Sequence, residues 1–291
     1  MMTKKLVLAA LLSFTTALPA AAQLAQNDEL RARLPQEILD RGSMISVNNG
    51  SFPPYQIVEG TNLTGATRDL ADAMGQLLGV EITHTSVAGL PAVLTGIASG
   101  RYTFAMGPVG DYPERQAAND FVDWVKEYVV FGVQAGNPAG ITDLASTCGK
   151  RIAVMAGGSA ENVINEQSAR CVADGQPAVE VQSFADQPSS ILAVRSNRSD
   201  AFFSSQAPLT YFVQQSGGGL ELAGVGQDNG FGDIHQGAVV PKDSALGPVL
   251  LDAFQILLDN GTYKDIMTKW GLEGNMTDTF GINLSAQAAA K

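Results

Sequence analysis

The sequence has 291 residues, of which 45% are hydrophobic and 16% are charged, so it predicts a packed globular protein with room for two ordinary domains. The formal net charge of −11 argues against a nucleic-acid backbone or an anionic membrane surface as the partner. The two histidines, His84 and His235, have no metal-ligand spacing to the cysteines, so neither a metal site nor another cofactor is expected.

The first 22 residues are typical of a secretory signal peptide. Lys4 and Lys5 precede an apolar run from Leu6 to Leu18, and small residues follow up to Ala22. The run is too short to span a membrane, no cysteine follows the cleavage point, and no later stretch reaches about 18 uninterrupted apolar residues. We therefore expect a protein that is exported to the periplasm without a lipid anchor.

Two cysteines, Cys148 and Cys171, remain in the exported chain. In an oxidising compartment an even pair favours a disulfide, and two buried free thiols are the alternative.

Residues 23–42 form a polar lead-in with one or two short helical turns, and strands and helices alternate after it. Strands are indicated by apolar residues that alternate with polar ones, and helices by apolar residues at three- and four-residue spacing. The predicted strands of this first series are 43–49, 80–87 and 101–109, and the predicted helices are 63–79 and 90–100.

A further helix is predicted to begin directly after the third strand. Asp111 is placed as its N-cap, Pro113 fits the first turn, and Glu114 completes a capping-box pattern. Arg115 follows at once. A turn with free N–H donors and one guanidinium is a good place to hold an anion, whereas the alternative is an ordinary surface arginine.

A second series follows the long β-rich run 126–138, which we interpret as a strand leaving the first unit. Its predicted strands are 150–158 with its turn, 178–184 and 200–206, its predicted helices are 159–171, 186–199 and 207–218, and the strand 233–241 carries the chain back to two final helices. This series is therefore inserted into the first, and the chain crosses between the two units twice. The expected organisation is 1–22 signal peptide, 23–42 lead-in, 43–131 with 226–280 as lobe 1, 132–225 as lobe 2, and 281–291 as a tail. Open α/β sheets bind ligands at the carboxyl ends of their strands, so two such lobes predict a hinged cleft.

Several stretches resemble one known family in their order and spacing. They include SVNNGSFPPYQ, GIASGRYTFAMGPVGDYPERQAANDFVDWV, DLASTCGKRIAVMAGGSA and DNGTYKDIMTKWG. The chain is similar over about 42–270 to the bacterial extracellular solute-binding proteins of family 3, the polar-amino-acid receptors of ABC importers. This resemblance implies the type II periplasmic binding fold, with two α/β lobes whose mixed, mostly parallel sheets are joined by a two-strand hinge.

The resemblance also implies a set of ligand contacts. Arg115 would pair with the carboxylate of the solute, and the turn at Gly158 and Ser159 would offer backbone N–H groups to the same carboxylate. Phe52 would stack on the solute, and Leu90 would supply an apolar wall. Further contacts fall on Gly107, Pro108, Gly110 and Ser205.

Three departures from the family pattern leave the nature of the solute open. Gly107 and Gly110 stand where side-chain hydroxyl donors are usual, and Ser205 stands where an acidic residue normally fixes the α-ammonium. Thr67 also replaces a usual acidic residue. An amino acid would need a carboxylate partner from a non-standard position, for which Asp111, Glu161 and Asp186 are candidates. A keto acid, an N-modified amino acid or another small organic acid would need none.

The favoured function is therefore a monomeric receptor that closes on a small carboxylate-bearing solute and then docks on an ABC permease. An enzyme of the same fold, such as a dehydratase-like relative, would need a general acid or base in the cleft. The candidate positions hold Gly107, Gly110 and Ser205, which cannot do that work. A ligand-holding domain of a larger receptor is the third alternative.

Overall fold

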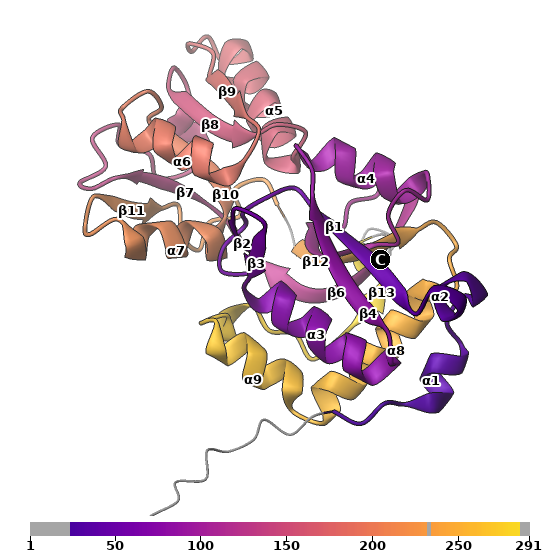
Figure 1. Cartoon of the computed structure of the whole chain (residues 1–291). Helices are drawn as coiled ribbons and strands as arrows, with labels where there is room; N and C mark the ends of the chain where they lie inside the picture. Colours follow the sequence, from indigo (N-terminus) through magenta and orange to yellow (C-terminus); the bar gives the residue numbers. More distant parts are fainter. Residues whose placement is uncertain (1–23, 232–233, 286–291) are drawn as a thin grey trace, which may run out of the picture.

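The computed structural model describes residues 24–231 and 234–285, so the predicted signal peptide and the last six residues lie outside the described part. Asp233, the first residue of the predicted strand 233–241, also lies outside it. The described chain forms two α/β lobes that lie side by side (Figure 1). In the described part of the chain, no helix combines the length and the apolar character needed to cross a lipid bilayer.

Lobe 1 contains both ends of the described chain. Its strands are β1 (Ser43–Asn48), β4 (Glu81–Ser86), β5 (Ala105–Gly110), β6 (Asn119–Glu127), β12 (Ile234–Pro241) and β13 (Gly281–Ile282), with a small hairpin of β2 (Ile57–Glu59) and β3 (Asn62–Thr64). Its helices are α1 (Asp28–Ala32), α2 (Gln36–Arg41), α3 (Ala66–Leu78), α4 (Leu90–Ala98), α8 (Leu246–Asp259) and α9 (Thr262–Lys269), and residues Glu273–Asn275 form a 3₁₀ turn. A parallel bridge from Ser46 to Phe104 connects the β1-β4 pair to the sheet β13-β6-β12-β5.

Lobe 2 is a five-stranded sheet in the order β11-β7-β10-β8-β9. Its strands are β7 (Val129–Gln134), β8 (Arg151–Met155), β9 (Glu180–Phe184), β10 (Ala201–Ser205) and β11 (Leu220–Ala223). Its helices are α5 (Ser159–Ala173), α6 (Gln187–Arg195) and α7 (Gln206–Gln215), with a 3₁₀ turn at Ala145–Thr147.

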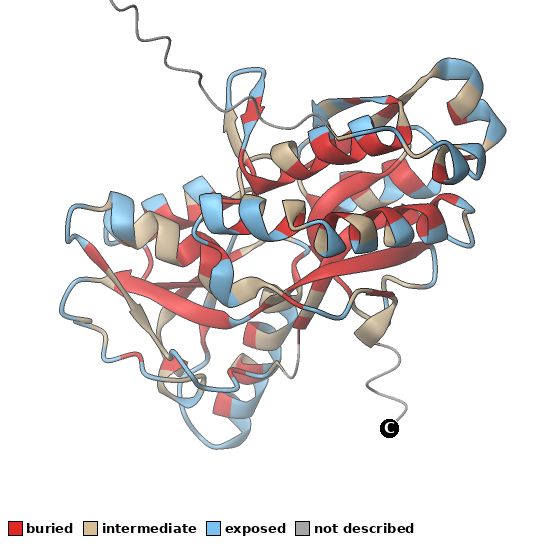
Figure 2. Cartoon of the chain, turned by 90° about the horizontal axis from the view of Figure 1, so that it is seen from below, coloured by how far each residue is buried: buried red, intermediate tan, exposed pale blue. Residues whose placement is uncertain are grey.

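Each lobe has an apolar core on both faces of its sheet, and the view in Figure 2 shows the buried residues concentrated on the strands and the inner sides of the helices. Helix α3 illustrates the pattern, because Leu70, Met74 and Leu77 recur at helical spacing and are buried. The helix ends where Gly79 adopts the left-handed conformation, with φ of 62°. Helices α3, α8 and α9 cover one face of the lobe 1 sheet, and α4 covers the other.

The two lobes are joined by two crossovers. The first is short, because β6 of lobe 1 ends at Glu127 and β7 of lobe 2 begins at Val129. The second runs from Ala223 to Ile234. The sheet changes at Tyr128, a few residues before the expected boundary at residue 131.

The sheets are mixed, as expected, but the prediction that they are mostly parallel is wrong. Strands β1-β4, β8-β9 and β8-β10 pair in parallel, whereas β12 is antiparallel to both neighbours and β7 is antiparallel to β10 and β11. The reason is that the crossover strands enter each sheet from the opposite lobe and therefore run against the local βαβ strands. The hairpin β2-β3 and strand β11 were not predicted.

The helix predicted after Gly110 does not form, and residues 111–118 are a series of turns. The capping pattern is present, but the segment has no apolar stripe that would bury a helix face. The Asp111 carboxylate does not cap a helix. It accepts hydrogen bonds from the Gln116 side chain (2.6 Å) and from the backbone N–H of Ser285 (2.9 Å).

The start of the tail is bound to lobe 1. Strand β13 pairs with β6, the Asn283 amide donates to Asp120, and the N–H of Leu284 donates to the Asp123 carboxylate (3.1 Å). Asp123 is 1% exposed, and its other oxygen has no N–H or O–H donor within the described residues, although it faces the Asp111 carboxylate. Burial and that neighbouring carboxylate raise the pKa of Asp123 to about 9. Asp123 therefore keeps its proton at neutral pH, next to the Asp111 side chain.

The predicted disulfide between Cys148 and Cys171 is present, with the two Cα atoms 5.6 Å apart. It ties the 3₁₀ turn before β8 to the last part of α5 and so fixes the position of that helix on the sheet.

Candidate functional site

A cleft between the lobes brings together the residues that the sequence singled out. Its lining includes Phe52, Leu90, Gly107, Pro108, Gly110, Arg115, Gly158, Ser159 and Ser205. Further lining residues, which the sequence did not single out as contacts, are Asn48, Asn49, Gln56, Tyr112, Met155, Gln187, Phe203, Ser204, Phe231 and Gln236. The lining comes from the carboxyl ends of β1, β5, β8 and β10, as expected for open α/β sheets.

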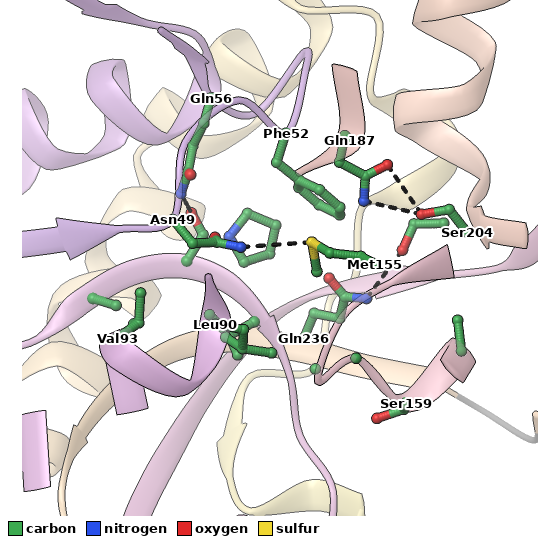
Figure 3. Close-up of a pocket in the computed structure, with 18 of the residues that line it drawn as sticks. Asn49, Phe52, Gln56, Leu90, Val93, Met155, Ser159, Gln187, Ser204 and Gln236 are labelled. Atoms are coloured by element: carbon green, nitrogen blue, oxygen red, sulfur yellow. Dashed lines mark hydrogen bonds between the residues drawn. The ribbon is translucent and has the colours of Figure 1, made fainter. Parts of the chain in front are cut away.

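The lobes are closed on each other in this structure. The Asn49 amide of lobe 1 contacts the Met155 sulfur of lobe 2 at 3.6 Å (Figure 3). Gly157 of lobe 2 approaches Pro91 of helix α4 so closely that a Cβ on the glycine would lie 2.9 Å from the proline ring. The remaining cavity has a volume of about 90 Å³.

Arg115 is the charged group of this cavity. Its Nη1 donates to the carbonyl of Gly110 (2.9 Å), and its guanidinium lies 4.9 Å from the ring centroid of Tyr112. Within the described residues its side chain forms no ion pair. Burial lowers the pKa of the Arg115 guanidinium, while Tyr112 and Glu114 oppose that shift, and the group remains charged at neutral pH.

Neighbouring atoms of the protein limit the space around Gly107 and Gly110. Gly107 has φ of +79°, and a Cβ there would lie 2.0 Å from the carbonyl oxygen of Gly237 on β12. A Cβ on Gly110 would lie 2.4 Å from the ring of Tyr112. A side chain at position 107 is therefore excluded by the backbone of β12, whereas one at position 110 would require the Tyr112 ring to move.

The N-terminus of helix α5 faces the cleft from lobe 2. The turn was expected to offer the amides around Gly157 to Ser159, but the Gly157 N–H donates to the Glu161 carboxylate (2.7 Å) and the Gly158 N–H to the carbonyl of Met155 (3.1 Å). Within the described part of the chain, no acceptor is recorded for the amides of Ser159 and its successor Ala160, which also lines the cleft. These two N–H groups lie at the positive end of the helix dipole.

Tyr112 connects Arg115 with this helix. Burial raises the pKa of the Tyr112 phenol, and the nearby Arg115 and the side chain of Ser159 partly offset the shift. The guanidinium, the phenol ring and the start of α5 are therefore neighbours across the two lobes.

The walls of the cleft are largely apolar. Phe52 projects into it (Figure 3) and stacks on Tyr55 with ring centroids 5.7 Å apart. Leu90, at the first turn of α4, is 5% exposed and faces Phe52 across the cavity lining. Phe203 and Phe231 form a second aromatic pair from lobe 2, with centroids 6.1 Å apart.

Neutral amides supply most of the remaining polar groups. Gln187 and the Ser204 hydroxyl hydrogen bond to each other (3.0 and 3.1 Å), and Gln236 donates to the Ser205 hydroxyl (3.4 Å; Figure 3). Gln56 donates to the carbonyl of Gly107 (2.6 Å). Asn48 and Asn49 could have been found from the sequence, because they are the last two residues of the predicted strand 43–49. Gln187 and Gln236 gave no local signal, and of the two only Gln236 of lobe 1 hydrogen bonds across the cleft, to Ser205 of lobe 2.

No group of histidine, cysteine and acidic side chains within the described ranges is arranged to hold a metal ion. The buried acids Asp123 and Glu127 lie outside the cleft lining, and Glu127 accepts from Tyr55 (2.7 Å) and Asn275 (2.8 Å).

Two hinged α/β lobes around a cleft with one buried cation define a ligand-binding protein. The family model of the bacterial extracellular solute-binding proteins, family 3, matches residues 44–273, so the chain belongs to that family. This confirms the predicted resemblance and the non-enzymatic, solute-binding class.

Related proteins support the same assignment. The chain is 26% identical to the arginine-binding protein ArgT of Corynebacterium glutamicum over 261 residues, which are 88% of this chain and 83% of that protein. The amino acid ABC transporter substrate-binding protein AbpA of Streptococcus pneumoniae, solved with L-arginine, has a TM-score of 0.72 at 20% identity, over 81% of this chain and 97% of its own.

A structure of an ancestral arginine-binding protein bound to arginine has a TM-score of 0.69 at 24% identity, over 79% of this chain and 98% of its own. An ancestral amino acid-binding protein that preceded cyclohexadienyl dehydratase has a TM-score of 0.67 at 18% identity, over 81% of this chain and 97% of its own. At these identities the likeness to solved structures shows the fold.

Proposed function

We propose that this protein is the periplasmic receptor of an ABC importer and that it captures a small carboxylate-bearing solute in the interlobe cleft. The observation that supports this most directly is Arg115, a partly buried guanidinium that lines the cleft and has no carboxylate partner in the described chain. Partial burial makes a cation without a directly paired carboxylate costly, so an anionic solute is its expected partner.

The arrangement supports closure driven by the solute. Arg115 belongs to lobe 1, and the amides of Ser159 and Ala160 belong to lobe 2. A carboxylate held by the guanidinium and by these amides bridges the two lobes, and these contacts form together only in the closed state. Solute binding therefore shifts the population from open to closed. The Tyr112 ring keeps the guanidinium in place for this contact.

The proposed partners and compartment follow from the family and the leader. Relatives are described as substrate-binding proteins of amino acid ABC transporters, and the family is extracellular. The apolar leader that ends near Ala22 supports export to the periplasm. We propose that the closed protein docks on an inner-membrane permease as a monomer.

The test of the proposed site is the substitution Arg115→Ala. A charge-assisted, bidentate contact contributes about 1.5–3 kcal/mol, so affinity for any carboxylate ligand of the wild-type protein is expected to fall at least tenfold. The ligand is found by a thermal-shift screen of carboxylates, and Kd is then measured by calorimetry.

Arg115→Lys keeps the charge but not the planar fork and is expected to give an intermediate Kd. Arg195→Ala, which removes an exposed arginine at the end of α6, is the matched control and should bind as the wild type does. An unchanged Kd in Arg115→Ala would remove Arg115 from the site and contradict the proposal.

A further inference from the structure

The charged side chains that line the cleft are not those that a zwitterionic solute would need. Of the residues that the structure describes, those lining the cleft include one charged side chain, Arg115, and no aspartate or glutamate. A bound monocarboxylate neutralises the charge of Arg115. A bound α-amino acid would also bring an ammonium, and no acidic side chain of the lining would neutralise it.

Asp111, the first of three acids that could have served an ammonium from a non-standard position, is committed elsewhere. Its carboxylate is 1% exposed and bound to the Gln116 side chain and the Ser285 N–H, on the side of the tail. The buried side chain of Asp123 also faces it. Asp111 is therefore part of the tail attachment and not of the cleft lining.

The other two candidates, Glu161 and Asp186, serve the starts of helices in lobe 2. Glu161 accepts from the Gly157 N–H (2.7 Å) and from the Ser183 hydroxyl. Asp186 is the N-cap of α6 and accepts from the Ser189 N–H (2.7 Å). Neither acid lines the cleft.

The groups that occupy the corresponding wall are neutral. Ser205, at the end of β10, is 8% exposed, and its hydroxyl accepts from Gln236. Ser204 beside it is paired with Gln187 in both directions. Hydroxyl and amide oxygens can accept a hydrogen bond from an ammonium, but they do not cancel its charge in a closed, poorly solvated cleft that already holds a guanidinium.

Three buried polar atoms of the lining have no hydrogen-bond partner within the described chain: Asn48 Nδ2, Gln56 Oε1 and Ser159 Oγ, the last at the start of α5. The Asn48 Nδ2 is a donor without an acceptor, and the Gln56 Oε1 is an acceptor without a donor, although both residues are about 5% exposed or less. Buried groups of this kind are usually satisfied by a ligand or by water. They suit a carbonyl or hydroxyl on the solute, and the walls of Phe52, Leu90 and Phe203 suit an apolar body.

From this geometry we infer that the solute is a small monocarboxylate that carries no ammonium, of the kind represented by 2-oxo and 2-hydroxy acids with an apolar body. This inference rests on the proposed function, since it takes the cleft as the solute site and Arg115 as the carboxylate partner. It separates this chain from the relatives whose names state that they bind arginine.

The test uses pairs of ligands that differ only in the α substituent. Calorimetry compares leucine with 4-methyl-2-oxopentanoate and 2-hydroxy-4-methylpentanoate, and phenylalanine with phenylpyruvate, with arginine included. In at least one pair the oxo or hydroxy acid is expected to bind at least a hundredfold more tightly than the amino acid. Arg115→Ala should weaken that binding at least tenfold.

A restored carboxylate should reverse the preference. Ser205→Asp places an anion in the neutral wall and is expected to favour the amino acid over its oxo counterpart. Ser205→Asn matches it in size without the charge and should not reverse the preference. Preference of the wild-type protein for the amino acid, with loss of binding in Arg115→Ala, would overturn this inference and leave the proposed function intact. If no carboxylate of either kind binds the wild type, both are overturned.

Discussion

The substitution Asp123→Asn tests whether Asp123 keeps a proton beneath the tail, next to Asp111. Asparagine has nearly the same shape, so its carbonyl oxygen can accept from the Leu284 N–H as the Asp123 carboxylate does. Its amide can then donate permanently towards Asp111, in place of the proton that Asp123 holds. The variant therefore keeps both contacts and loses only the titration.

The size of the effect follows from linkage. In the folded protein the pKa of Asp123 is raised from 3.8 to about 9, so between these values the folded state retains a proton that the unfolded state has released. This contribution to stability is complete below pH 3.8 and is lost as the pH rises towards 9. The slope is about 1.4 kcal/mol per pH unit, which amounts to about 3 kcal/mol between pH 6 and pH 8.

The assay is urea unfolding of both proteins at pH 6, 7 and 8, analysed as the difference in free energy of unfolding between variant and wild type. This difference is used because other groups, such as Glu127 with its pKa of about 7, titrate equally in both proteins. Asp123→Asn is expected to gain about 3 kcal/mol on the wild type across this range. Asp174→Asn, at the exposed end of α5, is the control and should gain nothing. Parallel stability curves for Asp123→Asn and the wild type would refute the retention of a proton by Asp123.

Two further predictions concern the stability of the fold. Replacing both Cys148 and Cys171 by alanine opens a disulfide with a sequence separation of 23 residues, and the free energy of unfolding in urea should fall by about 3 kcal/mol; a loss below about 1 kcal/mol would contradict this. Gly107→Ala places a Cβ 2.0 Å from the Gly237 carbonyl, so it should destabilise far more than the roughly 1–2 kcal/mol expected for Gly136→Ala, which has a similar φ of +78° but open space around its Cβ. Equal losses of stability in the two glycine variants would show that the contact with β12 is unimportant.

Local patterns predicted most of the elements that frame the site. Strand β1, helices α3 and α4, and strands β5 and β8 follow from periodic apolar residues, and the sequence placed the cleft at their ends. Arg115 was singled out because it follows a strand end in that series, and its role as the carboxylate partner came from the resemblance to the solute-binding family. The capping pattern predicted a helix around Arg115, but the segment forms turns. It has no apolar stripe that would stabilise a helix against the core.

The features that the sequence did not predict depend on distant parts of the chain. The need for glycine at position 107 comes from the backbone of Gly237 on β12, far along the chain. The commitment of Asp111 depends on Ser285 in the tail, and the neutral wall depends on Gln236 in the crossover strand. Such contacts leave no trace in short-range spacing, so the charge balance of the cleft required the folded structure.

The place of β12 in the first sheet has a consequence for the order in which the protein matures. This strand lies between β6 and β5, yet it is made after the whole of lobe 2. All strands of lobe 2 lie in one uninterrupted segment of the chain, so they become available together. The sheet of lobe 1 cannot be completed until its central strand β12 is available, and β12 begins more than a hundred residues after the end of β6. We therefore expect lobe 2 to fold first and, by folding, to bring β12 close to the incomplete sheet of lobe 1.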